Sequence, residues 1–449
     1  MSNDAPVTLL SSKPPTVAPV STESTPSAAP AAAERLSALD PSPISRELSL
    51  IAFNRRVLAL AADPAVPLLE RLRFLCIVGS NLDEFFEIRV AGLKEQLRSR
   101  IPPLGMTLPA LRTLLTDVGD ASRALIDDQY RLLNEEIFPA LATHGVRLLG
   151  RADRSPAERA WVADFFQREV RPLLTPIGLD PAHPFPQIVN KSLNFVVELS
   201  GHDAFGRDTM IAVVKAPRLV PRVIKLPREI SDADNEFLLL SSVMHAHLAD
   251  LFPGRGIVAF SQFRVTRDAD LWIDEEEVKN LRQALQGELP QRQFGIPLRL
   301  EVAESCPAHL ADYLLKQFEL TGDDLYRCDG PVNVMRLSSL IDQVEIDSLK
   351  YAPFVPGKPE RLAPDVDILA AIRQRDILLH HPYQSFEPVV DFIRHAADDP
   401  DVVAIKQTVY RTGVNSVLME ALIEAARRGK EVTVVVELMA RFDEEANIN

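Results

Sequence analysis

The sequence predicts a multidomain α+β protein with an N-terminal helical bundle, an α+β head domain and a β-α-β unit at its end. Three observations indicate this fold class. Apolar residues first recur at the three- and four-residue spacing of core-facing helices. Alternating strands mixed with helices follow, and two near-continuous apolar runs separated by a helix come last. We therefore expect a helical domain over residues 45–144, a head domain over 145–357 and an α/β segment over 358–449.

The N-terminal part divides into a tail and four expected helices. Residues 1–44 are rich in Pro, Ala, Ser and Thr and bury too little apolar surface to offset their ordering entropy, so we expect a disordered tail. Breaks at prolines and a glycine after the last periodic residue then delimit a helical bundle. The expected helices are one around 53–60, one over 68–78, one from Asn81, and a long one from near Thr107 to just before Gly145.

Asn81 has two interpretations that are compatible with each other. It resembles the first residue of a capping box, with Glu84 returning to its backbone N–H. A helix N-terminus is also a natural phosphate site. From the pattern alone, the capping role is favoured over a role in ligand binding.

The head region alternates strands and helices, which is typical of an α+β domain. Residues 193–199 alternate apolar and polar side chains, the period of a half-buried strand. Further strands are expected over 210–214, 222–226, 257–265 and 298–302, and helices over 237–251, 276–285 and 310–318. The proline-rich stretch 353–364 is an expected linker. Arg264 and Arg267 end one of these strands, and we interpret them as surface cations that pair with nearby acids.

The last segment predicts two parallel strands, 402–409 and 432–438, with a helix over 416–428 between them. Arg411 follows the first strand and Arg441 follows the second, so both are expected at the sheet edge where α/β proteins bind ligands. Two guanidiniums there would offer forked donors to phosphate oxygens. A salt-bridged surface loop is an equally good interpretation of this pattern. The polar residues that follow, which would suit a hydrated Mg²⁺ at the same edge, are Asp443, Glu444, Glu445 and Asn447.

The composition is acidic and otherwise ordinary for a globular protein. Its 49 Lys and Arg stand against 63 Asp and Glu, a formal net charge of −14. This acidity argues against a protein that coats nucleic acids in general, because such a protein needs a basic surface. It does not exclude a polyanionic substrate bound in a small cationic pocket. We expect no transmembrane segment and no secretory signal. Three scattered cysteines predict buried, reduced thiols in a cytoplasmic protein. No P-loop, G-x-G-x-x-G, G-x-S-x-G or H-E-x-x-H motif occurs.

Several stretches, taken in order, are similar to one known family. They are RELS with FNRRVL from Arg46, SNLDEF from Ser80, VTRDAD from Val265, RDILLHHPY from Arg375 and VVVELMARFDEEANI from Val434. The chain from about residue 45 onward resembles the bacterial polyphosphate kinases of the phospholipase-D-like type. One departure is Leu50, where the family usually has Trp.

The resemblance implies that residues 358–449 begin a phospholipase-D-like domain. It also implies reversible transfer of the terminal phosphate of ATP to polyphosphate through a phosphohistidine, with Mg²⁺ and a homo-oligomeric assembly. Asn81 matches the family's nucleotide-contacting asparagine, and Arg411 and Arg441 match the pair at its Mg²⁺-phosphate site. Because a guanidinium has no lone pair for a metal, these two are expected to hold phosphate oxygens.

The histidine that the resemblance calls for stands in an H-x-K context, and none of the nine histidines here does. We therefore expect it beyond Asn449, and expect this chain alone not to make polyphosphate. Two other hypotheses stay open. The chain could be a non-catalytic binding or oligomerisation fragment of such a kinase, or, more weakly, a phosphodiesterase of the phospholipase-D class.

Overall fold

The computed structural model describes residues 45–179, 184–202, 211–269, 280–363, 366–411, 413 and 416–449. The tail expected over 1–44 lies outside these residues, as do parts of the elements expected over 210–214 and 276–285 and of the linker expected over 353–364. The fold is multidomain α+β with an N-terminal helical region, as predicted. In the described part of the chain, no helix has the length and apolar character needed to cross a membrane.

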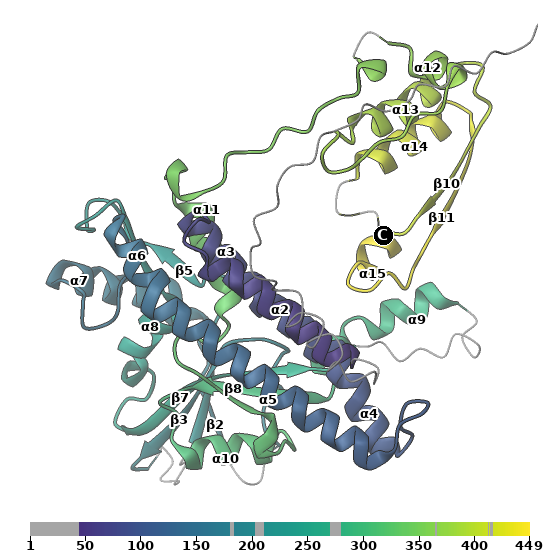
Figure 1. Ribbon diagram of the computed structural model, residues 1–449. Helices are drawn as coiled ribbons and strands as arrows, with labels where there is room; N and C mark the ends of the chain where they lie inside the picture. Colours follow the sequence, from purple (N-terminus) through teal and green to yellow (C-terminus); the bar gives the residue numbers. More distant parts are fainter. Residues whose placement is uncertain are drawn as a thin grey trace, which may run out of the picture. The chain divides into compact units, whose positions relative to one another are not determined.

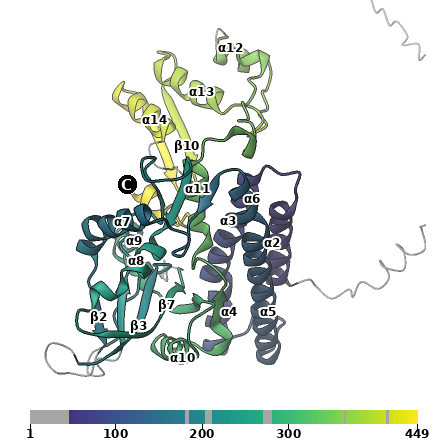
Figure 2. The same ribbon diagram turned by 90° about the vertical axis from the view of Figure 1, so that its left-hand side faces the viewer.

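The N-terminal region consists of long helices that lie side by side, with α2, α3 and α5 adjacent in both views (Figures 1 and 2). Thr107 caps α5 by accepting a hydrogen bond from the Ala110 N–H at 3.3 Å, and Gly145 adopts a left-handed conformation after the last helix, as expected. The helices are α2 (Arg46–Ala62), α3 (Leu68–Glu84), α4 (Ala91–Ser99), α5 (Leu108–Leu132) and α6 (Phe138–Thr143), with π-helical turns η1 (Phe85–Val90) and η2 (Leu133–Ile137).

The expected break before Asn81 is wrong. Helix α3 runs through Gly79 and Ser80 to Glu84 and continues through η1 into α4, so Asn81 lies inside a helix and caps nothing. Gly79 is used for close packing instead: a Cβ there would lie 3.0 Å from Val334 Cγ1. The glycine therefore marks a tight helix contact rather than a helix boundary.

The described residues of the head region form two sheets. A six-stranded sheet has the order β2-β4-β3-β7-β8-β9, antiparallel except for β8 with β9, and a three-stranded sheet has the order β1-β6-β5. The strands are β1 (Val146–Leu148), β2 (Ile177–Leu179), β3 (Asn194–Ser200), β4 (Ile211–Lys215), β5 (Val223–Lys225), β6 (Asn235–Leu239), β7 (Gly256–Arg267), β8 (Pro297–Ala303) and β9 (Leu325–Cys328). The helices are α7 (Pro156–Phe165), α8 (Leu240–Ala246), α9 (Leu281–Glu288), α10 (Ala308–Gln317) and α11 (Ser338–Gln343).

Two expectations for this region need correction. The stretch 237–251 begins as strand β6 and becomes helix only at Leu240, because Phe237 and Leu238 pair in register with β1 and β5. Strand β3 is buried on both faces rather than half-buried. Phe195 packs with the N-terminal helices while Val196 packs on the opposite face with α10, so the sheet is covered on both sides (Figure 1).

The C-terminal segment forms the predicted β-α-β unit. Strands β10 (Ala404–Val409) and β11 (Glu431–Val436) pair in parallel around α14 (Val417–Arg427). Its further helices are α12 (Ile368–Gln374), α13 (Glu387–Asp398) and the short α15 (Glu444–Ile448). The expectation that both faces of these strands are covered is wrong for this chain. Helices α13 and α14 pack on one face, and the other leaves Val435 exposed.

Candidate functional site

Asn81, Arg411 and Arg441 line one cavity of about 350 Å³. The first comes from the N-terminal helices and the other two from the strand ends of the β-α-β unit. The structure therefore brings all three residues singled out in the sequence to a single place. Their roles in binding remain predictions, since a shared cavity shows position and not a ligand.

The Asn81 side of the cavity is formed by a pair of asparagines on neighbouring helices. The Asn81 side-chain amide donates a hydrogen bond of 2.8 Å to Asn54 Oδ1 on α2. Asn54 in turn donates from its own amide to the Leu50 carbonyl at 3.0 Å. This chain of bonds orients the Asn81 side chain and leaves its oxygen as an acceptor.

The arginine side of the cavity is held by one buried asparagine. Asn447 donates to the carbonyls of Tyr410 and Glu437, at 2.8 and 2.7 Å, and so ties together the two chain segments that leave β10 and β11. Arg411 donates from Nη2 to the Arg441 carbonyl at 3.2 Å, and its Nε lies 3.0 Å from a carboxylate oxygen of Asp443. The two arginines are therefore fixed next to each other, as the parallel strands predicted.

A bidentate ion pair fixes the loop after Arg441 to the head region. Arg292 binds the buried carboxylate of Glu444 through both terminal nitrogens, and its Nε donates to the Ala269 carbonyl at 2.9 Å. Its guanidinium carbon also lies 5.4 Å from the ring centre of Phe442. Of the polar residues expected to suit a metal, Glu444 and Asn447 are thus committed to structural contacts. Within the described residues, no group of three or more His, Cys, Asp or Glu side chains gathers as a metal site.

The helix that carries Asn81 rests on a buried network of four charges. Arg264 on β7 donates to both oxygens of Asp83 at 2.9 Å, and Arg299 on β8 contacts one of them at 2.6 Å. Glu301 accepts a hydrogen bond from Arg264 and forms an ion pair with Arg299, and all four side chains are at most 5% exposed. Burial alone would raise the pKa of Asp83, but the neighbouring guanidiniums of Arg264 and Arg299 overcome it and the pKa lies below its ordinary value.

The interpretation of Arg264 and Arg267 as surface cations is therefore wrong. Strand alternation does point Arg264 away from the apolar face that holds Phe263 and Val265. The other face is covered by the N-terminal helices, so the charge is buried against Asp83, which is remote in sequence. Arg267 is also buried, and it donates to two backbone carbonyls rather than to a neighbouring acid.

Further cavity residues were missed in the sequence. Arg46 and Arg89 line the cavity, together with the exposed rings of Phe53 and Phe442. Arg89 lies eight residues after Asn81, a spacing that places both on one face of a continuous helix. The helix expected from Asn81 already contained both residues, so this spacing was available in the sequence. Among the described residues, the lining of this cavity contains four arginines and a single acid, Glu84.

Comparisons with known proteins place the chain in a family. The pattern described as polyphosphate kinase N-terminal domain matches residues 44–149, the middle-domain pattern matches 157–340, and the pattern of C-terminal domain 1 matches 367–449. Together these matches span most of the chain. The chain belongs to the polyphosphate kinase family.

Relatives within the family cover most of this chain. Polyphosphate kinase from Neisseria gonorrhoeae is 53% identical over 408 residues, and that from Burkholderia vietnamiensis is 52% identical over 409. Each alignment covers 90% of this chain and 59% of the relative, so the chain spans less than two thirds of these relatives' length. A crystal structure of polyphosphate kinase from Porphyromonas gingivalis matches with a TM-score of 0.73 at 27% identity, over 90% of this chain and 57% of that one.

Proposed function

We propose that this chain carries a nucleotide- and phosphate-binding site of an ATP–polyphosphate phosphotransferase. The observation that carries the proposal is the convergence of Asn81, Arg411 and Arg441 on one cavity that also contains Arg46 and Arg89. Four guanidiniums around one small space repel one another, and the carboxylates of Glu84 and Asp443 offset only part of that positive charge. A multiply charged phosphate ligand relieves that repulsion and accepts their forked hydrogen bonds.

We assign the residues by their position in the cavity. Arg411 and Arg441, fixed side by side at the strand ends, hold phosphate oxygens of the transferred group or of its acceptor. Asn81, whose amide is oriented by Asn54, hydrogen-bonds the nucleotide. The rings of Phe53 and Phe442 are about half-exposed, at 53% and 46%, and offer flat apolar surface to a base.

The residues present fit a magnesium ion that is bound mainly through phosphate. Mg²⁺ in such enzymes takes one or two carboxylates and completes its shell with phosphate oxygens and water. Asp443 offers a carboxylate next to Arg411, and its side chain is 29% exposed. When bound, the ion would neutralise charge on the phosphates while the arginines orient them.

The remaining expectations from the family resemblance belong to this proposal. They are the phosphohistidine intermediate, the phospholipase-D-like character of the C-terminal segment, the domain boundaries, the homo-oligomer and the cytoplasmic location. No histidine in this sequence has the H-x-K context of the phosphorylated one. We therefore propose that the 449-residue chain binds nucleotide but does not itself extend polyphosphate.

Calorimetric titration of the chain with ATP and Mg²⁺ tests the proposal. Replacing either Arg411 or Arg441 with alanine should weaken ATP binding about tenfold, since a hydrogen bond to a charged group contributes about 1.5–3 kcal/mol. Arg427→Ala is the matched control, an exposed arginine on α14 outside this cavity. Equal affinities for Arg441→Ala, Arg427→Ala and the unchanged chain would refute the site. The corresponding arginines of a longer family member should also be required for its ATP-dependent polymer formation.

A further inference from the structure

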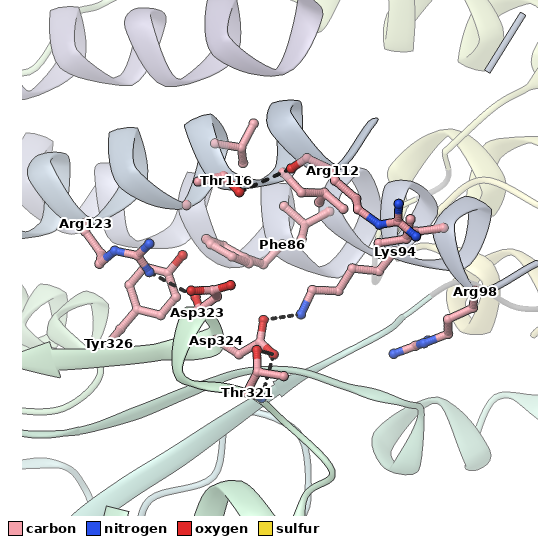
Figure 3. A pocket seen from close by; sticks show the side chains of 15 residues that line it. Phe86, Lys94, Arg98, Arg112, Thr116, Arg123, Thr321, Asp323, Asp324 and Tyr326 are labelled. Carbon is pink, nitrogen blue, oxygen red and sulfur yellow. Dashed lines mark hydrogen bonds and ion pairs between the residues drawn. The ribbon is translucent and has the colours of Figure 1, made fainter. Parts of the chain in front are cut away.

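A second cavity, of about 470 Å³, lies where the α4–α5 helices meet the loop before β9. It is lined by η1 and α4, which follow Asn81 along the chain, by α5 and by the turn η7 (Gly322–Asp324) (Figure 3). It shares no lining residue with the cavity that contains Arg411 and Arg441. Its volume falls in the range of pockets that take small organic ligands.

One end of this cavity carries positive charge that its own acids do not balance. Lys94, Arg98 and Arg112 lie together there (Figure 3). Arg98 has a loose ion pair with Glu95 at 3.8 Å. Within the described part of the chain, the Arg112 guanidinium makes no ion pair or hydrogen bond, although its backbone carbonyl accepts one from Thr116. These two exposed arginines come from consecutive helices and are available to a ligand.

One of the two acidic residues in the lining, Asp324, is already occupied. Asp324 accepts hydrogen bonds from the Thr321 backbone N–H and hydroxyl, both at 3.0 Å, in a capping box, and it forms an ion pair with Lys94. Lys94 also donates to the Leu298 carbonyl at 2.8 Å. This lysine and this aspartate therefore neutralise each other, and the two arginines keep their charge.

The opposite end and the wall are different in character. The half-buried side chains of Leu97 and Leu115 present apolar surface to the cavity. The rings of Tyr326 and Phe86, which also line it, pack edge-to-face with their centres 5.4 Å apart. Arg123 lies at this far end and donates to the Asp323 carbonyl at 2.9 Å (Figure 3). The cavity therefore joins a cationic end to an apolar wall with polar groups beyond it.

We propose that this second cavity binds a nucleoside phosphate, separately from the site that contains Arg441. The phosphate groups take the forked donors of Arg98 and Arg112, and the base lies against the apolar wall of Leu97 and Leu115. An inorganic phosphate chain would contact only the arginines at the cationic end, and the apolar wall of Leu97 and Leu115 would stay exposed to water. The amphipathic lining therefore favours the nucleotide.

The test is calorimetric titration of the chain with ADP and, separately, with inorganic tripolyphosphate. We expect two ADP sites in the unchanged chain. The double variant Arg98→Ala/Arg112→Ala should weaken one of them at least about tenfold and leave the other in place. Arg56→Ala, at an exposed position that lines neither cavity, is the matched control and should leave both sites intact.

Two further measurements separate the possible outcomes. Leu115→Ala should weaken ADP at the second site and leave tripolyphosphate unaffected, because only the base touches the wall. A single ADP site that the double arginine variant does not change would overturn the proposal, and so would tripolyphosphate binding this site as tightly as ADP. Loss of ADP binding in Arg441→Ala reports on the proposed function instead, because that residue lines the other cavity.

Discussion

Replacing Asp83 with alanine is expected to lower the free energy of unfolding by about 3–5 kcal/mol, the usual cost of breaking a buried ion pair. Asp83 is 3% exposed and accepts from Arg264 twice and from Arg299 once. Without it, two buried guanidiniums share the single carboxylate of Glu301. The cost comes from leaving a charge uncompensated in the interior, not from the attraction alone.

The assay is urea unfolding followed by circular dichroism at pH 7, with Asp234→Ala as the matched control. Asp234 also pairs with an arginine, Arg228, at 2.9 Å, but the two side chains are 69% and 82% exposed. Exposed pairs of this kind contribute about 0–1 kcal/mol. Equal effects of the two substitutions would refute the idea that burial, rather than pairing, sets the energy.

Two further measurements sharpen this prediction. Adding Arg299→Met to Asp83→Ala removes one charge of each sign and should recover part of the loss, because an apolar side chain tolerates the interior better than an unpaired charge. The pH dependence has a defined sign, since the folded-state pKa of Asp83 lies below its ordinary value of 3.8. The unchanged chain should therefore have a higher free energy of unfolding than the Asp83→Asn variant. This difference should be complete above pH 3.8 and disappear as the pH falls through the folded-state pKa of Asp83.

Three other outcomes follow from single features of the fold. Arg292→Ala should weaken ATP binding about tenfold in titration although it lies outside that cavity, because the loop that carries Arg441 loses its bidentate anchor; unchanged affinity would contradict this. Gly145→Ala should destabilise by about 1–2 kcal/mol in urea unfolding because its φ is +73°, whereas Gly92→Ala, with open space around the new methyl inside a helix, should stabilise by about 0.5–1 kcal/mol. Burial raises the pKa of the Cys76 thiol to about 12, so a thiol reagent at pH 8 should modify it only after unfolding; rapid labelling of the folded chain would disprove its burial.

The sequence sufficed for features that depend on local pattern. The β-α-β unit, the start of a long helix near Thr107 and the left-handed Gly145 follow from periodicity and from residue types that act on their immediate neighbours. Because parallel strands end at the same sheet edge, the adjacency of Arg411 and Arg441 could be predicted as well. These expectations concern neighbours in the chain or a short crossover between two strands.

Other features were decided by tertiary packing. Helix α3 continues through Gly79, where the glycine allows close packing against Val334, far along the chain. Arg264 is buried because helices cover its face of the sheet and Asp83 compensates its charge. The spacing at which apolar residues recur in the sequence shows which residues share one face of a helix or strand. Whether that face meets water or another element is decided by which distant segments pack on it, and only the tertiary structure supplies that information.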